Sequence, residues 1–558
     1  MGGSGELGPV QSELGPAQGV FGPSGAMSGG EALVRALAAH GVEWAFGIPG
    51  THNLEVYRHL RPYGIRQVAP RHEQGAGYAA DGYARVTGRP GVAVTTTGPA
   101  LLNIAAAAGQ AYSDSVPLLV VSPGMPLRHP RQPTGLLHEM RSQTEAMRGV
   151  TAFSHRVSSV EEIGAAVARA FTLFRSGRPR PVHIEVPLDL LVSREPVGAV
   201  RVAPPAAVPR PDATAVREAA GALVRAGRVG LVLGGGARGA VAESLALAEE
   251  LGALVVTSAN GKGTVDERHP LSLGVSLHDP GVRKALGDCD AVLAVGTELA
   301  ESDLWSDPPA ALGGTLVRVD VDPAQMYAGV PAQVALVGDA RECLRELIRA
   351  LAAGPGGHAP PESAELVGRL RRERDAATAA RDGRWLPYLR VVRAALDEDA
   401  VLTSDSAQCC YYGALPHLPV GPRGRFLHPT GFGTLGYALP AAVGVKAAQP
   451  GRQVVALSGD GGLQFTVQEL ATAAQLRLPL PVVVFDNGGY GEIRDEMAAR
   501  GDTPVAVDQP PVDLPALCRA YGGAGERVTT PGALADALAR ALRHPGPTLI
   551  TVPEEVPV

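Results

Sequence analysis

The most regular feature of the chain is an alternation between short apolar runs and amphipathic stretches. Runs rich in valine and leucine, such as residues 117–121, 229–233 and 454–458, are typical of buried strands. The segments between them carry apolar residues at helical spacing. Alternating strands and helices indicate a parallel sheet that helices cover on both faces. We therefore predict an α/β fold.

The alternation occurs in three successive units, which linkers rich in proline, alanine or glycine separate. We predict a doubly wound parallel sheet in each unit, over residues 28–195, 210–347 and 384–558. Residues 1–27 repeat Glu-Leu-Gly-Pro and are rich in glycine, proline and serine. Such a segment buries too little apolar surface to become ordered, so we predict a disordered leader.

Composition restricts the function classes. The 558 residues carry a net charge of −6 and give a pI of about 6.2, which offers no electrostatic support for a nucleic-acid partner. The five cysteines form no CxxC pair and suit a reducing compartment. We find no apolar run of membrane-spanning length and no secretion signal. These features predict a cytoplasmic protein with a small-molecule substrate and no membrane partner.

The stretch from Ser458 to Gly491 carries the strongest chemical signal. One predicted strand breaks at Gly459-Asp460-Gly461-Gly462, and the next ends before Asn487. Carboxyl ends of neighbouring parallel strands lie where open α/β sheets bind ligands. A carboxylate, an amide oxygen and free carbonyls suit Mg²⁺, and glycine amides at a helix start suit phosphates. The alternative interpretation is an ordinary strand–turn–helix crossover.

Two further patterns are ambiguous from the residues alone. Glu73 lies in the first turn of a predicted helix, where the helix dipole by itself favours a carboxylate. The spacing of Gly234, Gly236 and Gly239 fits the dinucleotide fingerprint. The following strand, however, ends in Thr257 and Ser258 instead of the acidic residue that the fingerprint requires. We predict a structural turn there.

Taken together, the units and their motifs resemble the acetolactate synthase and 2-oxo-acid decarboxylase family of thiamine diphosphate enzymes. The resemblance covers nearly everything from Gly30 onward. The motifs that carry it, in family order, are Gly47-Ile-Pro-Gly50, His72-Glu-Gln-Gly75, Gly98-Pro99 with Asn103, Val182-His-Ile-Glu-Val-Pro187, Gly433-Thr-Leu-Gly436, and Asp460 with Asn487. In that family the first unit binds the cofactor's pyrimidine, the last binds its diphosphate, and the central unit is structural or binds a nucleotide.

The resemblance implies a role for each matching residue. Glu73 would be the catalytic glutamate, which shares a proton with the pyrimidine and so favours the C2 ylide that attacks a 2-oxo acid. Carbon dioxide would then leave to give an enamine. Asp460, Asn487 and the Gly489 carbonyl would hold Mg²⁺. The other implied cofactor contacts are Pro49, Pro99, Asn103, Gln408, Gly433, Leu435, Gly461, Gly462 and Tyr490.

The resemblance also bears on assembly and on a second cofactor. The family's sites form between subunits, so a homodimer or homotetramer is implied. Acetolactate synthases hold FAD in their central unit. In this chain FAD is possible but not expected.

The departures from the acetolactate synthases bear on the substrate. His138 stands in a Leu-His-Glu triplet where those enzymes usually have Phe-Gln-Glu, and Cys409 replaces a histidine. Glu492 and Glu496 replace apolar residues, and helical spacing puts them with Asp495 on one face. Two interpretations stay open, a solvated acidic face or a pocket end that binds a cationic tail. His138, Glu492 and Glu496 are therefore our candidate substrate residues.

The run Gly-Tyr-Gly-Glu-Ile-Arg at 489–494 also looks like that of the 5-guanidino-2-oxopentanoate decarboxylases. We therefore predict a lyase that uses thiamine diphosphate and Mg²⁺ to decarboxylate a 2-oxo acid with a cationic tail. The main alternative is an acetolactate synthase-type carboligase. A non-catalytic binding subunit is a third hypothesis, against which the presence of Glu73, Asp460 and Asn487 together argues.

Overall fold

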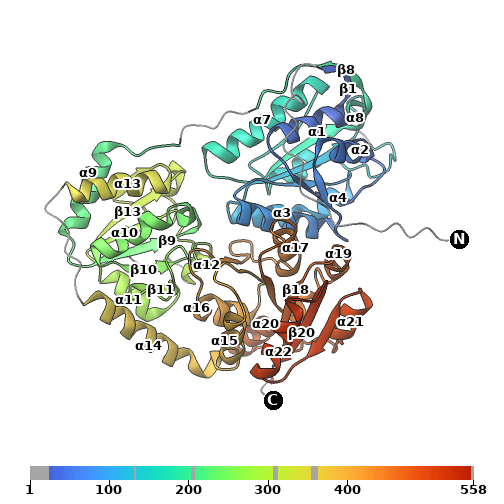
Figure 1. Cartoon of the computed structure of the whole chain (residues 1–558). Helices are drawn as coiled ribbons and strands as arrows, with labels where there is room; N and C mark the ends of the chain where they lie inside the picture. The colour runs from blue at the N-terminus through green and yellow to red at the C-terminus, as the bar shows by residue number, and fades with distance from the viewer. Residues whose placement is uncertain (1–23, 131–132, 203–207, 306–311, 354–361, 555–558) are drawn as a thin grey trace.

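The structure is a computed structural model, and it describes residues 24–130, 133–202, 208–305, 312–353 and 362–554. Three lobes are visible, each built around a six-stranded parallel sheet with helices packed against it (Figure 1). The apolar runs of the sequence form the buried strands of these sheets. The predicted α/β class with three doubly wound sheets is confirmed.

The first domain has the strand order β3-β2-β4-β5-β7-β6. Its strands are β2 (Trp44–Gly47), β3 (Arg66–Val68), β4 (Gly91–Val94), β5 (Leu118–Gly124), β6 (Phe153–Arg156) and β7 (Val182–Pro187). Its helices are α1 (Gly29–Ala39), α2 (Leu54–Leu60), α3 (Glu73–Thr87), α4 (Pro99–Asn103), α5 (Ala105–Ser113), α6 (Gln143–Arg148), α7 (Val160–Ser176) and α8 (Leu188–Val192).

The middle domain has a different order, β11-β10-β9-β12-β13-β14. Its strands are β9 (Val229–Leu233), β10 (Leu254–Thr257), β11 (Ser272–Val275), β12 (Ala291–Val295), β13 (Thr315–Asp320) and β14 (Val334–Val337). Its helices are α9 (Ala213–Arg225), α10 (Val241–Leu251), α11 (Pro280–Gly287), α12 (Glu301–Leu304) and α13 (Ala340–Ala352).

The third domain repeats the connectivity of the first, with the strand order β16-β15-β17-β18-β20-β19. Its strands are β15 (Val401–Ser404), β16 (Arg425–Leu427), β17 (Val454–Gly459), β18 (Leu480–Asp486), β19 (Ala524–Arg527) and β20 (Pro547–Pro553). The helices are α14 (Ser363–Asp382), α15 (Leu386–Ala394), α16 (Leu415–His417), α17 (Ala438–Ala448), α18 (Asp460–Leu463), α19 (Glu469–Gln475), α20 (Gly491–Ala499), α21 (Leu514–Ala520) and α22 (Pro531–Ala541), with a π-helix at Cys409–Ala414.

In each sheet the strand order reverses between two neighbouring strands, and α/β folds bind ligands outside the carboxyl ends of such a pair. The pairs are β2 and β4 in the first domain, β9 and β12 in the middle domain, and β15 and β17 in the third. The Gly47–Gly50 motif follows β2, the Gly98-Pro99 turn follows β4, and Asp460 follows β17, so the topology places these three motifs at the expected crevices.

The predicted disordered leader needs a correction at its end. Residues 24–27 belong to strand β1 (Ser24–Ser28), which pairs antiparallel with β8 (Arg194–Val197). Met27 is buried. Composition could not show this, because the pairing partner lies far along the chain. Residues 1–23 fall outside the described residues.

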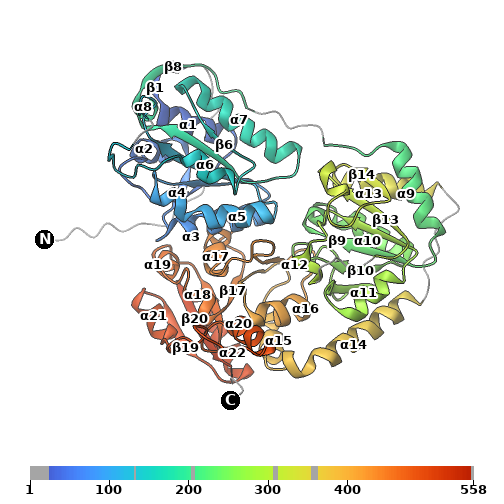
Figure 2. The same cartoon turned by 180° about the vertical axis from the view of Figure 1, so that it is seen from behind.

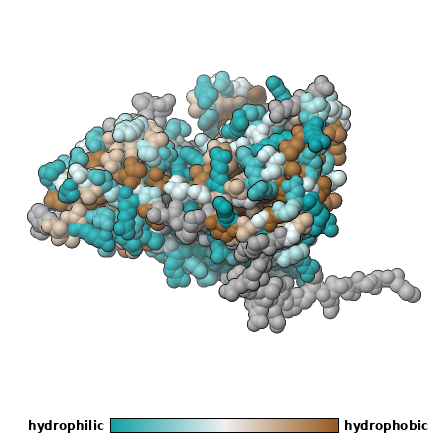
Figure 3. Space-filling model, turned by 90° about the horizontal axis from the view of Figure 1, so that it is seen from above, coloured by the Kyte–Doolittle hydropathy of each residue, from teal (hydrophilic) through white to brown (hydrophobic). Residues whose placement is uncertain are grey.

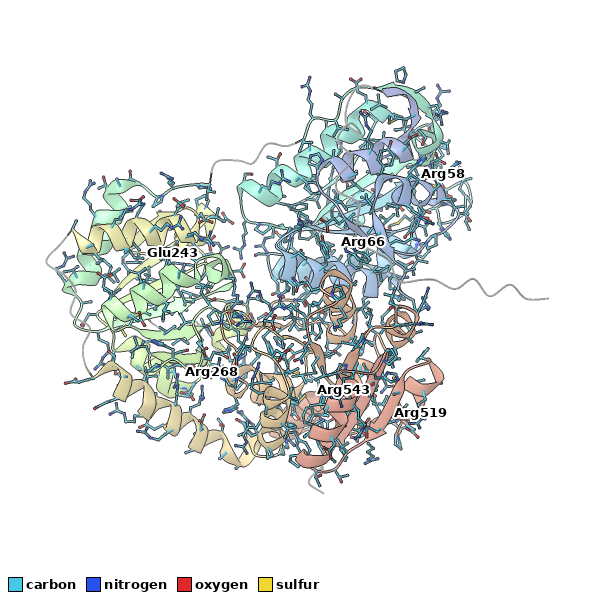
Figure 4. All side chains as sticks on the ribbon, viewed as in Figure 1. Arg58, Arg66, Glu243, Arg268, Arg519 and Arg543 are labelled. Atoms are coloured by element: carbon cyan, nitrogen blue, oxygen red, sulfur yellow. The ribbon has the colours of Figure 1, made fainter. Side chains whose placement is uncertain are left out.

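The first and third domains pack closely through α3 and α17, as both views show (Figures 1 and 2). Glycine allows this approach, because a side chain at Gly82 or Gly444 would run into the backbone of the opposing helix. The middle domain joins the third through charged pairs such as Arg268 with Glu398, 2.7 Å apart (Arg268 is labelled in Figure 4).

Seen from above, hydrophobic residues form several separate groups among hydrophilic ones (Figure 3). Across the residues that the structure covers, no helix has both the length and the apolar character needed to span a membrane.

Candidate functional site

Three oxygen atoms meet at the carboxyl ends of β17 and β18. The side-chain oxygen of Asn487 faces Asp460 Oδ1 at 3.3 Å and the Gly489 carbonyl oxygen at 3.0 Å. Reversing the amide would let its nitrogen donate hydrogen bonds to both. In the oxygen-inward orientation all three oxygens could act as ligands of one cation, and Asp460 Oδ1 also accepts a hydrogen bond from the Asn487 backbone amide at 3.2 Å. Neighbouring ligands of an octahedral ion with bonds of about 2.1 Å lie about 3.0 Å apart, so the spacing suits Mg²⁺.

The ligand chemistry matches this ion. Among the described residues, no group of three or more histidine, cysteine, aspartate or glutamate side chains is arranged to hold a metal ion, and the group around Asp460 contains only one such side chain. A set with one carboxylate, one amide and one carbonyl leaves positions for water and phosphate, as Mg²⁺ prefers. Burial raises the pKa of Asp460 to about 6, and a neighbouring cation would favour its ionised form.

The glycines of the Asp460 turn allow neighbouring loops to pack closely against it. A Cβ atom on Gly461 would meet the Gly489 carbonyl oxygen at 2.9 Å and the Tyr490 ring at 3.1 Å. One on Gly462 would lie 3.3 Å from Asp405 Oδ2 and 3.6 Å from Leu435 Cδ2. The turn, the Asn487–Tyr490 loop and the Leu435 loop can therefore close around one small volume.

Asp405 was not among the predicted site residues. It follows β15, is buried, and accepts a hydrogen bond from the Gly436 amide at 2.9 Å and one from Ser458 Oγ at 3.1 Å. Burial raises its pKa to about 6. Asp405 thus fixes the loop that carries Leu435. Its place at the carboxyl end of a strand beside the switch point was the available sequence signal.

In the first domain the predicted residues Glu73, Pro99 and Asn103 come together. Glu73 opens α3 and is half-buried, and Asn103 Nδ2 donates to its Oε2 at 2.9 Å. Asn103 ends the short helix that Pro99 begins. Gly98, immediately before Pro99, has a φ of 62°, a conformation that favours glycine. Pro49 lies in the turn after β2.

His138 belongs to a polar cluster beside this group. Thr97 Oγ1 is hydrogen-bonded to His52 Nδ1 at 2.6 Å and to His138 Nδ1 at 3.2 Å, and the two imidazole rings are 5.4 Å apart. His138 has a φ of 61°, which is strained for a residue with a side chain. Burial lowers the pKa of His52, and the charge of His138 lowers it further. Sequence patterns did not single out His52.

The acidic residues of α20 separate in space. Glu492 Oε1 accepts a 2.6 Å hydrogen bond from the Tyr412 hydroxyl, while its Oε2 is buried without a hydrogen-bond partner. Asp495 accepts a 2.6 Å hydrogen bond from Gln408 Nε2. Glu496 is 52% exposed and lies 3.5 Å from Arg500. Glu492 therefore has the environment of a binding group, whereas Glu496 fits the solvated interpretation.

The remaining predicted contacts lie around the third-domain group. Gln408 also accepts from Arg384 at 3.3 Å, so its amide is engaged by protein groups. Gly433 has a φ of 62° and is exposed, and Leu435 is half-buried. Within the described ranges, no hydrogen bond or ion pair joins Glu73 or Asn103 to Asp460, Asn487 or Leu435. Below, the group around Glu73 and the group around Asp460 are called the two half-sites.

A separate cavity of about 720 Å³ lies where the three domains meet. Its walls include the glycine turn at Gly235–Gly239, Arg85 and Asp114 of the first domain and Arg425 of the third. The glycine turn packs tightly, since a Cβ on Gly236 would meet Gly296 Cα at 2.8 Å. The glycines thus allow this turn to pack closely while it forms part of the cavity wall.

Three thiamine pyrophosphate enzyme models match the chain. The N-terminal TPP-binding domain matches residues 27–146, the central domain 216–347 and the C-terminal TPP-binding domain 407–552. A probable 2-ketoarginine decarboxylase of Pseudomonas aeruginosa is 44% identical over 500 residues, which cover 89% of this chain and 88% of that protein.

Acetolactate synthases are more distant relatives. A probable large subunit from Methanocaldococcus jannaschii is 30% identical over 556 residues, covering 94% of this chain and 92% of the relative. The isozyme 3 large subunit of Escherichia coli is 31% identical over 543 residues, covering 93% and 92%. The similarity thus extends over nearly the whole length of each protein.

Proposed function

Because the chain belongs to the thiamine pyrophosphate enzyme family, we propose that it decarboxylates a 2-oxo acid with a cationic, guanidino-type tail. The products would be an aldehyde and carbon dioxide. The observation that carries the substrate assignment is the buried Glu492 Oε2, which has no hydrogen-bond partner. The 44% identity to a probable 2-ketoarginine decarboxylase supports the same assignment.

A guanidinium group fits Glu492 in charge and in geometry. A buried carboxylate oxygen without a partner costs about 1–3 kcal/mol or more. The planar N–H groups of a guanidinium complement a carboxylate and can pair with both of its oxygens. The Tyr412 hydroxyl occupies one acceptor position and holds the carboxylate, which leaves Oε2 for the tail. The methyl group of pyruvate would leave that oxygen unpaired.

The two half-sites would have different roles toward the cofactor. Glu73, held by Asn103, would share a proton with the pyrimidine of thiamine diphosphate. Asp460, Asn487 and the Gly489 carbonyl would hold Mg²⁺. When bound, the cofactor supplies an acceptor for the electrons of the breaking carbon–carboxylate bond. The other contacts to the cofactor would come from Pro49, Pro99, Gln408, Gly433, Leu435, Gly461, Gly462 and Tyr490, and His138 would face the substrate.

We also propose that the half-sites of two chains combine in a homodimer or homotetramer. Apolar side chains beside both halves are solvent-exposed in the single chain: Leu102 (51%), Phe432 (51%) and Phe465 (46%). A second copy would bury them. A cytoplasmic location fits the cysteines, all of which are free and buried. FAD is not expected.

The second candidate is an acetolactate synthase-type carboligation, which the 30–31% identities to such enzymes support. Both reactions begin with decarboxylation of a 2-oxo acid. They differ in the next step: the reactive carbon either takes up a proton or forms a bond to the carbonyl carbon of a second 2-oxo acid. Acetolactate formed from pyruvate, with 5-guanidino-2-oxopentanoate left unchanged, would establish this candidate instead.

The test compares two glutamates of one helix on two substrates. With 5-guanidino-2-oxopentanoate, Glu492→Gln should lower kcat/KM about 100-fold, equivalent to about 3 kcal/mol for a truncated buried charge pair. With 2-oxohexanoate, which is uncharged at its end, the loss should stay below about threefold. Glu496→Gln is the matched control and should change neither value by more than about twofold. Equal losses on both substrates for Glu492→Gln would contradict the tail-binding role.

A further inference from the structure

A buried carboxylate of the third domain binds the backbone of the first domain. Glu469, at the start of α19, is 1% exposed. Its Oε1 and Oε2 accept hydrogen bonds from the Arg71 amide at 3.0 and 3.1 Å, and Oε1 also accepts from the His72 amide at 3.1 Å. Thr472 Oγ1 donates to Oε2 at 2.6 Å. Both carboxylate oxygens are therefore occupied by donors.

The two amides immediately precede Glu73. His72 is the N-cap of α3 and has extended backbone angles, φ −148° and ψ 147°. Residues 71 and 72 thus lie outside the hydrogen-bond ladder of the helix, which leaves their amides in need of other partners. Glu469 supplies those partners. Because consecutive Cα atoms are a fixed 3.8 Å apart, anchoring residue 72 sets where Glu73 begins the helix.

Gly75 provides independent support for this contact. A Cβ atom at Gly75 would lie 2.5 Å from Glu469 Oε1 and 3.1 Å from its Cγ. The carboxylate therefore rests directly against the first turn of α3, and only glycine leaves it room. This explains the glycine of the His72-Glu-Gln-Gly75 motif without any contact to a ligand.

We propose that Glu469 is a positioning residue that holds Glu73 in place for the cofactor. The proposal rests on the role proposed above for Glu73. Glu469 lies on the segment that follows α18, which begins with Asp460. The carboxylate thus ties the element proposed to hold the metal and diphosphate to the helix turn that carries Glu73. Loss of the tie should misplace Glu73 while the substrate pocket stays intact.

The first test needs no cofactor. Glu469→Gln keeps the size of the side chain but turns one acceptor oxygen into an NH₂ donor that faces backbone N–H groups. Hydrogen–deuterium exchange of the Arg71 and His72 amides, followed in the free protein, should become at least about tenfold faster. The matched control is Glu267→Gln. Glu267 is also a buried carboxylate that joins two domains, through Lys262 at 2.6 Å and the Val420 amide at 2.8 Å.

The control should leave exchange at residues 71 and 72 unchanged. Thr472→Val removes one donor to Glu469 and spares both backbone contacts, so it should shift exchange in the same direction by a smaller factor. It also serves if Glu469→Gln does not fold. Unchanged exchange at residues 71 and 72 in both variants would overturn the proposal.

Kinetics then separate positioning from a purely structural role. Glu469→Gln should lower kcat about 10- to 100-fold, while KM for the 2-oxo acid and Kd for thiamine diphosphate stay within about threefold. Faster exchange with an unchanged kcat would show that the tie is only structural and overturn the proposal. Glu73→Gln distinguishes failure of the proposed role of Glu73 from failure of the proposed role of Glu469. If Glu73→Gln keeps full activity, the proposed role of Glu73 fails, whatever the exchange result for Glu469→Gln.

Discussion

The switch points of the third and middle domains can be compared directly. In the third domain β15 and β17 lead into Asp405 and the Gly459–Gly462 turn. In the middle domain β9 and β12 lead into the Gly234–Gly239 turn and Gly296. Both sheets thus place a glycine-rich turn where α/β folds form ligand crevices. Glycine content alone does not distinguish them.

The difference lies in what the glycines bring together. Around Gly461 they let the side-chain oxygen of Asn487 lie 3.3 Å from Asp460 Oδ1 and 3.0 Å from the Gly489 carbonyl oxygen, contacts that a cation or a reversed amide would satisfy. In the middle domain the Gly236 amide donates to the Gly296 carbonyl at 3.1 Å, so the close approach there pairs a donor with an acceptor. The two turns therefore differ in the atoms that their glycines bring together, which are oxygens in the third domain and a donor with an acceptor in the middle domain.

The largest effect should come from removing the charge in the third-domain turn. Asp460→Asn would replace the only carboxylate of the proposed Mg²⁺ site with a neutral amide. We expect a loss of at least about 100-fold in activity and a comparable loss in Mg²⁺-dependent affinity for thiamine diphosphate, measured by calorimetry. Cofactor affinity that stays equal to that of the wild type would remove Asp460 from the metal site.

A smaller effect is expected from a pair of glycine substitutions, Gly461→Ala in the third domain and Gly236→Ala in the middle domain, which should have different consequences. In Gly461→Ala the new methyl group would displace the Gly489 carbonyl, so we expect at least about tenfold weaker Mg²⁺-dependent cofactor binding. In Gly236→Ala it would press on the Gly296 backbone, which costs about 1–3 kcal/mol of stability. Gly236→Ala should lower the melting temperature by several degrees and leave the affinity for thiamine diphosphate unchanged. Weakened cofactor binding in Gly236→Ala instead would erase the distinction between the turns.

The smallest effect concerns Asp405 and pH. Burial raises its pKa in the folded protein to about 6, above the usual 3.8. The folded state therefore binds more protons than the unfolded state between about pH 4 and pH 6, so this group's contribution to stability falls as pH rises through that window. Asp405→Asn should gain stability relative to the wild type over the same window, by up to about 3 kcal/mol.

Thermal midpoints of both proteins at pH 4.5, 6 and 8, without cofactor, check this prediction. The difference between the two midpoints should grow from pH 4.5 to 6 and change little above about pH 7. A constant difference at all three values would mean that Asp405 has the same pKa in both states.

Much of the fold followed from the local pattern of residues. The apolar run at 454–458 forms β17 and the one at 482–485 lies in β18, because buried parallel strands require continuous apolar side chains. Glu73 begins a helix as expected, and its neighbours Pro99 and Asn103 come from the predicted turn. Motif spacing was enough to relate the chain to its family, because turn chemistry depends on residues that are adjacent in the sequence.

The sequence by itself thus determined three α/β units, the family and the residues at the strand ends. Tertiary structure decided which of these residues meet. Helical spacing put Glu492 and Glu496 on one face, but the position of Tyr412 separates a buried carboxylate from an exposed one. Likewise, β1 needs β8, and Arg71 needs Glu469. These contacts join residues far apart in the chain, and local hydrophobic period and turn chemistry carry no information about such distant partners.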